Sequence, residues 1–209
     1  MRIYVKGDYT KEIPFDYLEL AKRMWFDTKD GKTVDFSYFG NTRPFKTDPT
    51  IHLKLNKWMH DKRWNNVQLK EGIINKFRSH VYENLELDFE DHPATDYREK
   101  GDCLRLASTH LDLLTVDKRA MYIMALEIAI AIDGQISEDD KKTWLTVEEF
   151  KEKHQDILSL TFDEANEMSL EEIQTIDAID DPIWEELDKK REEYIQIHGE
   201  RVYDDEEDE

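Results

Sequence analysis

Apolar residues recur along the first part of the chain with two different periods. In 2–6 and 33–39, apolar and polar side chains alternate, which is the pattern of a strand with one buried face. Near 15–26, 51–59 and 66–86, apolar residues recur every three or four positions, which predicts amphipathic helices. The N-terminal part is therefore predicted to be a small α/β element with strands near 2–6 and 33–39.

The second part of the chain carries stronger helical signals. Residues 120–132 are apolar except for Tyr122 and Glu127, which predicts a buried central helix. Asp102 can cap an earlier helix. Further start signals are the S/T-x-x-E capping boxes at Thr146, Thr161 and Ser169 and the Asp181-Pro182 pair. They predict helices that begin near 147, 162, 170 and 182. The predicted fold class is α+β and mostly helical, with a C-terminal helical half.

Charge divides the chain at about the same place. The 209 residues have a net charge of −20, but residues 1–80 carry 16 Lys and Arg against 10 Asp and Glu, a net of +6. Residues 81–209 carry 13 against 39, a net of −26. We therefore expect a mixed segment with basic helices over 1–87, a linker over 88–101, a helical acidic segment over 102–199 and a disordered acidic tail over 200–209.

Composition also limits the class of protein. Cys103 is the only cysteine, so no intramolecular disulfide framework exists, and a reducing compartment, the cytoplasm, is expected. No apolar run approaches the ~20 residues that a membrane-spanning helix needs. Phosphate-binding glycine loops, zinc-protease and nucleophile-elbow motifs are absent from the sequence. We therefore expect no cofactor and no enzymatic activity.

The acidic half is the first candidate for a functional surface. A strongly negative field attracts a basic protein and disfavours nucleic acid, so the expected partner is a basic, nucleic-acid-handling protein. Phage-type inhibitors and immunity proteins are similar in composition. The predicted partner-binding residues are Glu185, Glu186, Asp188, Trp184, Tyr194 and Trp144.

The basic stretch supports a second hypothesis, a nucleic-acid-binding module over 43–78. Cations interleaved with aromatic rings suit single-stranded nucleic acid, which binds by charge neutralisation and base stacking. The alternative is that the tryptophans face the core and the cations meet the acidic half of the same chain. The candidate residues are Lys54, Lys57, Trp58, Arg63, Trp64 and Lys70.

A third hypothesis is a carboxylate-rich metal-binding helical domain or an enzyme. The seven histidines are scattered, and one of them lies in the dense acidic stretch 88–96. The string Asp133-Gly-Gln-Ile-Ser137 is similar to the helix junction of tellurite-resistance-type helical domains, which implies an acidic metal-binding surface. Its alternative is a simple helix stop at Gly134. The candidate ligands are Asp88, Glu90, Asp91, His92, Asp133 and Asp140.

Overall fold

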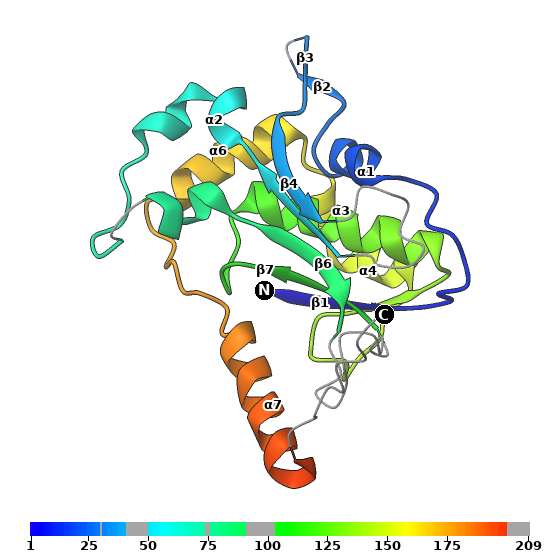
Figure 1. The fold of residues 1–209 in the computed structure, drawn as a ribbon. Helices are drawn as coiled ribbons and strands as arrows, with labels where there is room; N and C mark the ends of the chain where they lie inside the picture. The colour runs from blue at the N-terminus through cyan, green and yellow to red at the C-terminus, as the bar shows by residue number, and fades with distance from the viewer. Residues whose placement is uncertain (30, 41–49, 74–75, 91–102, 200–209) are drawn as a thin grey trace, which may run out of the picture.

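A six-stranded antiparallel sheet forms the centre of the computed structural model, which describes residues 1–29, 31–40, 50–73, 76–90 and 103–199 (Figure 1). The strands follow the order β4-β5-β6-β7-β1-β8. Their bounds are β1 Arg2–Lys6, β4 Phe36–Gly40, β5 Ile51–Leu55, β6 Leu85–Phe89, β7 Leu104–Ser108 and β8 Gln135–Ser137. A separate hairpin pairs β2, Thr28–Lys29, with β3, Lys32–Thr33.

The helices gather around α3, which packs on β1 and β8 and contacts α1, α4, α5 and α6. In Figure 1, α7 extends away from this body. The helices are α1 Tyr17–Met24, α2 Lys57–His60, α3 Thr115–Ala131, α4 Val147–Lys153, α5 Gln155–Leu158, α6 Phe162–Glu172 and α7 Ile183–His198. Three short 3-10 turns complete the chain: η1 Lys62–Asn66, η2 Lys76–Arg78 and η3 His80–Tyr82.

The sheet register explains where the core lies. Ile51 pairs with Leu87, Leu87 with Leu106, and Leu106 with Ile3. This row of four fully buried aliphatic side chains crosses four neighbouring strands. Because side chains in a strand alternate between faces, one buried residue in two is enough to give each strand its core face.

Two short segments overturn the prediction of a mostly helical chain. The described residues contain seven helices and the six-stranded sheet, 44% helix and 20% strand, which is a mixed α+β fold. Residues Ile51–Leu55 and Leu104–Ser108 are strands β5 and β7, although 51–59 and 102–114 were predicted to be helical. Both segments are only five residues long, a length at which buried strands and helices share the same apolar pattern.

The predicted helix over 66–86 is also wrong. The described part of this stretch contains the turns η1, η2 and η3 and the first residues of β6. Gly72 has a φ of +98°, a left-handed conformation that ends regular helix. Ser79 then accepts a hydrogen bond from the backbone N–H of Val81 and so caps η3 rather than continuing a helix.

The helix starts predicted near 147, 162 and 182 in the acidic segment are confirmed, whereas those at Asp102 and near 170 are wrong. Helix α3 contains most of the run 120–132, and α4, α6 and α7 begin at Val147, Phe162 and Ile183. Thr146 and Thr161 form complete capping boxes. The predicted start near 170 is wrong, because Ser169-Leu-Glu-Glu172 lies at the end of α6.

The third capping-box sequence, Ser169-Leu-Glu-Glu172, caps the start of α3 instead of a helix of its own. Helix α3 has no side-chain cap of its own at Leu114. Instead, Glu172 accepts hydrogen bonds from the backbone N–H and the hydroxyl of Thr115, at 2.8 and 2.6 Å, and the Ser169 hydroxyl accepts one from the N–H of Val116 at 2.9 Å. The end of α6 therefore fixes the start of α3.

Strands from the predicted mixed segment 1–87 and from the predicted acidic segment 102–199 belong to one sheet. Strand β6 pairs with β7, so residues on either side of the predicted linker lie side by side. Asp88 and Phe89, at the start of the predicted linker 88–101, are part of β6. The rest of that linker beyond Glu90, through 101, and the predicted tail 200–209 lie outside the described residues.

The string Asp133–Ser137 forms a turn into a strand. Asp133 has a φ of 47°, and a Cβ at Gly134 would lie 2.6 Å from the carbonyl oxygen of Lys6. The close approach of β1 therefore requires glycine here. The following residues form β8 against β1, so Ser137 does not cap a helix.

The centre of α3 gives a direct test of the core. Ile128 is fully buried, whereas Ile130, two residues later on the same helix, is 49% exposed. Replacing Ile128 with Ala should cost about 2–5 kcal/mol, through lost burial and the cavity left behind. Ile130→Ala should stay within about 0.5 kcal/mol. Urea denaturation of both variants checks this, and equal losses would contradict the assignment of faces.

Candidate functional site

A cluster of ionisable side chains is buried where η3, α2 and the start of α3 meet. Its members come from both charge segments of the chain, and each is at most 1% exposed. They are Lys57, His80, Glu83, His110 and Asp117. Buried charges are costly unless they are paired, so the pairing within this cluster decides what it can do.

Lys57 and Asp117 form the first pair. The ammonium Nζ of Lys57 lies 2.7 Å from the carboxylate of Asp117 and donates a hydrogen bond to the carbonyl oxygen of His80 at 3.0 Å. Asp117 lies in the first turn of α3, where the helix dipole favours a negative charge. Burial raises the pKa of Asp117 to about 6, although Lys57 acts in the opposite direction.

His80 is held in one orientation by the backbone. Its ring nitrogen Nε2 donates to the carbonyl oxygen of Asp112, with 2.6 Å between the two atoms. The proton therefore resides on Nε2, which leaves a lone pair on Nδ1. Nδ1 is fully buried and has no hydrogen-bond partner among the residues that the structure describes. Burial lowers the pKa of His80 to about 4, so the ring is neutral near pH 7.

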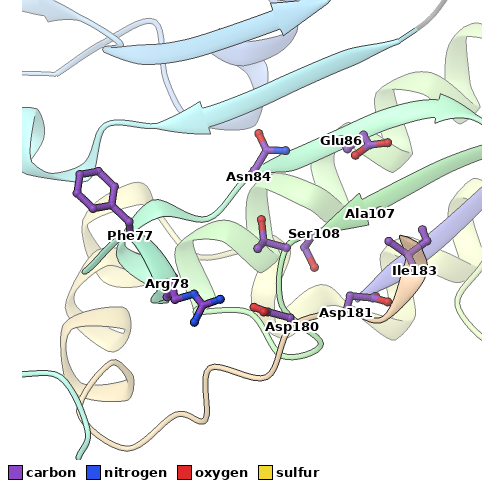
Figure 2. A pocket seen from close by; sticks show the side chains of 10 residues that line it. Phe77, Arg78, Asn84, Glu86, Ala107, Ser108, Asp180, Asp181 and Ile183 are labelled. Atoms are coloured by element: carbon purple, nitrogen blue, oxygen red, sulfur yellow. The ribbon is translucent and has the colours of Figure 1, made fainter. Parts of the chain in front are cut away.

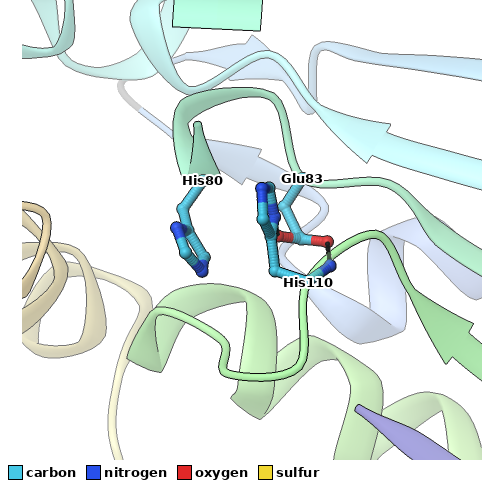
Figure 3. Close-up of side chains that lie close together, drawn as sticks. All are labelled: His80, Glu83 and His110. Carbon is cyan, nitrogen blue, oxygen red and sulfur yellow. Dashed lines mark hydrogen bonds and ion pairs between the residues drawn. The ribbon is translucent and has the colours of Figure 1, made fainter. Parts of the chain in front are cut away.

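His110 and Glu83 form the second pair. Nδ1 of His110 lies 2.6 Å from the carboxylate of Glu83, and the backbone N–H of His110 donates to the other carboxylate oxygen at 3.3 Å. Burial acts to lower the pKa of His110, but the hydrogen bond to Glu83, the charge of Glu83 and smaller contributions from Arg78 and Asp180 together raise the pKa above its ordinary value. The rings of His80 and His110 stack, with centroids 4.0 Å apart (Figure 3).

A cleft of about 350 Å³ lies beside this cluster (Figure 2). Its lining includes Arg78, Asn84, Glu86, Ser108, Asp180 and Asp181. The backbone of 179–181 pairs with that of 109–111, and the carboxylate of Asp180 lies 3.8 Å from Nε2 of His110. The segment that leads into α7 therefore separates His110 from solvent.

The cluster contains donors suited to a transition metal. Within the described residues, His80, Glu83 and His110 are the one group whose candidate ligand atoms all lie within 4.8 Å of one another. Imidazole nitrogens and a carboxylate oxygen are ordinary zinc ligands.

Of the described residues, no helix is both long and apolar enough to cross a bilayer.

The predicted metal ligands are placed elsewhere. Glu90 forms an ion pair with Lys141, and Asp133 forms one with Lys11. Asp88 accepts a hydrogen bond from the hydroxyl of Thr50, and Asp140 has a left-handed φ of 54°. Asp91 and His92 lie outside the described residues. None of the four described candidates belongs to the buried donor group.

The predicted nucleic-acid residues are mostly engaged within the chain. Trp64 is 1% exposed and donates to the side chain of Asn166. Lys57 is buried against Asp117, Arg63 pairs with Asp61 and Glu167, and Lys70 pairs with Asp177. Trp58 is half-buried against Tyr82, and the ammonium of Lys54 lies 5.5 Å from the centre of the same ring.

The predicted partner-binding residues divide between two places. Glu185 and Asp188 are exposed on α7, while Glu186 pairs with Arg2 at 2.6 Å. Tyr194 is half-buried and stacks on His198. Trp144 precedes α4 and lies beneath the ammonium of Lys6, 4.1 Å from the ring centre. Trp184 begins α7, but its side chain is not among those described.

Sequence reasoning missed the buried cluster. His80 and Glu83 are three residues apart, which a helix would have placed on one face, but His110 is 27 residues beyond Glu83. The pairing of β6 with β7 brings them together. The local signal that could have found them is the presence of His80 and Glu83 beside the apolar residues Val81 and Leu85.

Comparison with known proteins gives no relative. A scan against protein-family models finds no matching family, and searches of curated proteins and of solved structures find no match. The functional argument therefore rests on the residues themselves.

The Lys57–Asp117 pair can be tested by a double-mutant cycle. Lys57→Met should cost about 3–5 kcal/mol, because Asp117 is left buried without its counter-charge. The double variant Lys57→Met/Asp117→Val should recover at least half of that loss, because the uncompensated charge is gone. Chemical denaturation gives both values.

An exposed ion pair supplies the control for this cycle. Lys70 and Asp177 have side chains 43% and 61% exposed. Lys70→Met should change the free energy of unfolding by less than about 1 kcal/mol. A Lys57→Met variant that loses no more than the Lys70→Met variant would show that the buried pair does not hold the core together.

Proposed function

We propose that this chain is a small acidic interaction protein that binds and regulates, or inhibits, a basic nucleic-acid-handling protein. The observation that supports it is the distribution of ion pairs. Several cations of the basic segment form ion pairs with carboxylates of the acidic segment, as in Arg63–Glu167 and Lys70–Asp177. With a net charge of −20, an excess of carboxylates must remain. Such a surface attracts a basic partner and repels nucleic acid.

Helix α7 is the best candidate for the contact surface. Glu185, Asp188 and Glu192 are spaced by three and four residues, so they share one helical face, and all three are exposed. No described residue forms an ion pair with them. Ile183 and Leu187 lie on the opposite face and are buried and half-buried. The first turns of the helix therefore place their apolar side inward and their carboxylates outward.

Exposed apolar groups on α7 and on the segment before it add the anchor that charge alone does not supply. Ile197 on α7 is 76% exposed, and Ile179 on the segment that leads to α7 is 54% exposed. Binding energy at protein interfaces concentrates in a few apolar anchors, whereas charges set the association rate and specificity. We assign the anchoring role to Ile197 and Ile179, and the role of setting the association rate and specificity to the carboxylates of α7.

The proposal includes a cytoplasmic location and a mode of action without catalysis. Cys103 is the only cysteine and is buried, and we place the protein in the cytoplasm, a reducing compartment. The module acts by occupying a basic surface, not by catalysis, as phage-type inhibitors and immunity proteins do.

Capture from a nuclease-treated lysate tests the proposal. The immobilised chain should retain a basic nucleic-acid-binding protein at about 50 mM salt and release it near 0.5 M, since exposed charges are screened over ~10 Å at 0.1 M. The variant Glu185→Lys/Asp188→Lys/Glu192→Lys should retain at least about tenfold less of the same protein.

The matched control reverses three other exposed carboxylates. Glu148, Glu152 and Asp156 lie on α4 and α5, and Glu148→Lys/Glu152→Lys/Asp156→Lys changes the net charge by the same amount. This variant should retain the partner much better than the α7 variant. Equal losses would show that net charge, and not α7, attracts the partner. Retention unchanged in both variants would contradict the proposal.

A further inference from the structure

The buried group His80, Glu83 and His110 has features that an apolar core does not need. Their side chains are at most 1% exposed, and each offers a metal-binding atom within 4.8 Å of the other two. His80 and Glu83 come from η3 and the residue after it, and His110 follows β7. Figure 3 shows the two imidazole rings face to face, with the carboxylate beside His110.

His80 carries the first observation that points to a ligand. Its Nε2 donates to the carbonyl oxygen of Asp112, and its Nδ1 is buried and unpartnered within the described part of the chain. Histidines that bind metals are held in this way, with one nitrogen donating to a backbone carbonyl or a carboxylate and the other free to coordinate. A buried polar atom without a partner requires an explanation, and an ion is one of the few available.

Glu83 and His110 complete the group. They share a proton over 2.6 Å, between Nδ1 of His110 and the carboxylate. A divalent cation can take the place of that proton, because it binds the lone pair of the nitrogen and the negative oxygen together. In a doubly protonated ring the displaced proton passes to solvent, and in a neutral ring it moves to Nε2, so the nitrogen that binds the cation has a free lone pair in both cases.

We propose that His80, Glu83 and His110 bind one divalent transition-metal ion, with zinc as the best-fitting class. Two nitrogen donors and one carboxylate oxygen match zinc, whereas calcium and magnesium take sets of oxygen ligands. The rings are inclined by only 23° and must tilt for both lone pairs to meet one ion. The nearby carboxylate of Asp117 is paired with Lys57, so this pair adds no net charge to the site.

Three protein ligands leave a fourth coordination position open for water. Within the described residues no other histidine or carboxylate belongs to the group. Zinc sites with three protein ligands keep such a position. This site lies in the core and shares no residue with the contact surface on α7. A test of the site is therefore independent of a test of the proposed function.

Zinc titration of the metal-stripped full-length chain, against a competing chromophoric indicator and in excess Mg²⁺, tests the proposal. One equivalent of zinc should bind, and the melting temperature should rise with zinc concentration. Glu83→Gln preserves size and should weaken zinc binding at least about 100-fold, more than the loss from an outer-shell change. Excess Mg²⁺ blocks carboxylate clusters, so it separates this site from the acidic surface.

His154→Gln is the matched control. His154 also pairs with a glutamate, Glu138, at 2.7 Å, but this pair has no third donor within the described residues. The His154→Gln variant should bind zinc as tightly as the unaltered chain does. Equal binding by the Glu83→Gln variant and the unaltered chain, or no binding by the unaltered chain, would overturn the proposal.

A measurement on the unaltered chain covers the case in which Glu83→Gln does not fold. X-ray absorption of the zinc-loaded protein should show two imidazole ligands in the zinc shell, because His80 and His110 supply both nitrogens. A shell of oxygen ligands alone would place the ion on surface carboxylates and overturn the assignment.

Discussion

Lys57 and Asp117 face each other inside the protein, 2.7 Å apart and almost completely excluded from water. Each would be costly to bury alone, and together they must lie in one geometry to offset the loss of hydration. Lys57 follows β5 in the basic segment, and Asp117 opens α3 in the acidic segment. Their contact therefore positions α3 against the sheet, and the carbonyl of His80 is held in the same place.

The same opposition of charge continues outward along the contact between the two segments. Arg63 reaches Glu167 on α6, where Asn166 binds both Trp64 and Asp61. Lys29 reaches Asp163 near the start of α6. Exposed pairs contribute little stability each, but they decide which charges remain for a partner. Several cations of the basic segment are therefore paired within the chain, and an excess of carboxylates remains.

The sequence predicts elements whose signals are local and long. The apolar run of α3 and the capping boxes of α4 and α6 lie within a few residues, so helix starts at 147 and 162 could be predicted. Strands β5 and β7 could not, because five apolar-rich residues become strands only through pairing with distant neighbours. Ser169 and Glu172 have the form of a capping box, but the N–H groups they satisfy belong to α3. The buried cluster could not be predicted from the sequence for the same reason, since strand pairing brings its residues together.

Binding of the purified chain to nucleic acid tests the central claim, that intramolecular pairing cancels the basic segment. Fluorescence anisotropy with labelled single-stranded DNA, single-stranded RNA and duplex DNA at physiological salt is the direct measurement. The account predicts no binding to any of the three, because Lys57 and Trp64 are buried and Arg63 and Lys70 are paired. Clear binding that Lys54→Glu and Arg63→Glu abolish would contradict it.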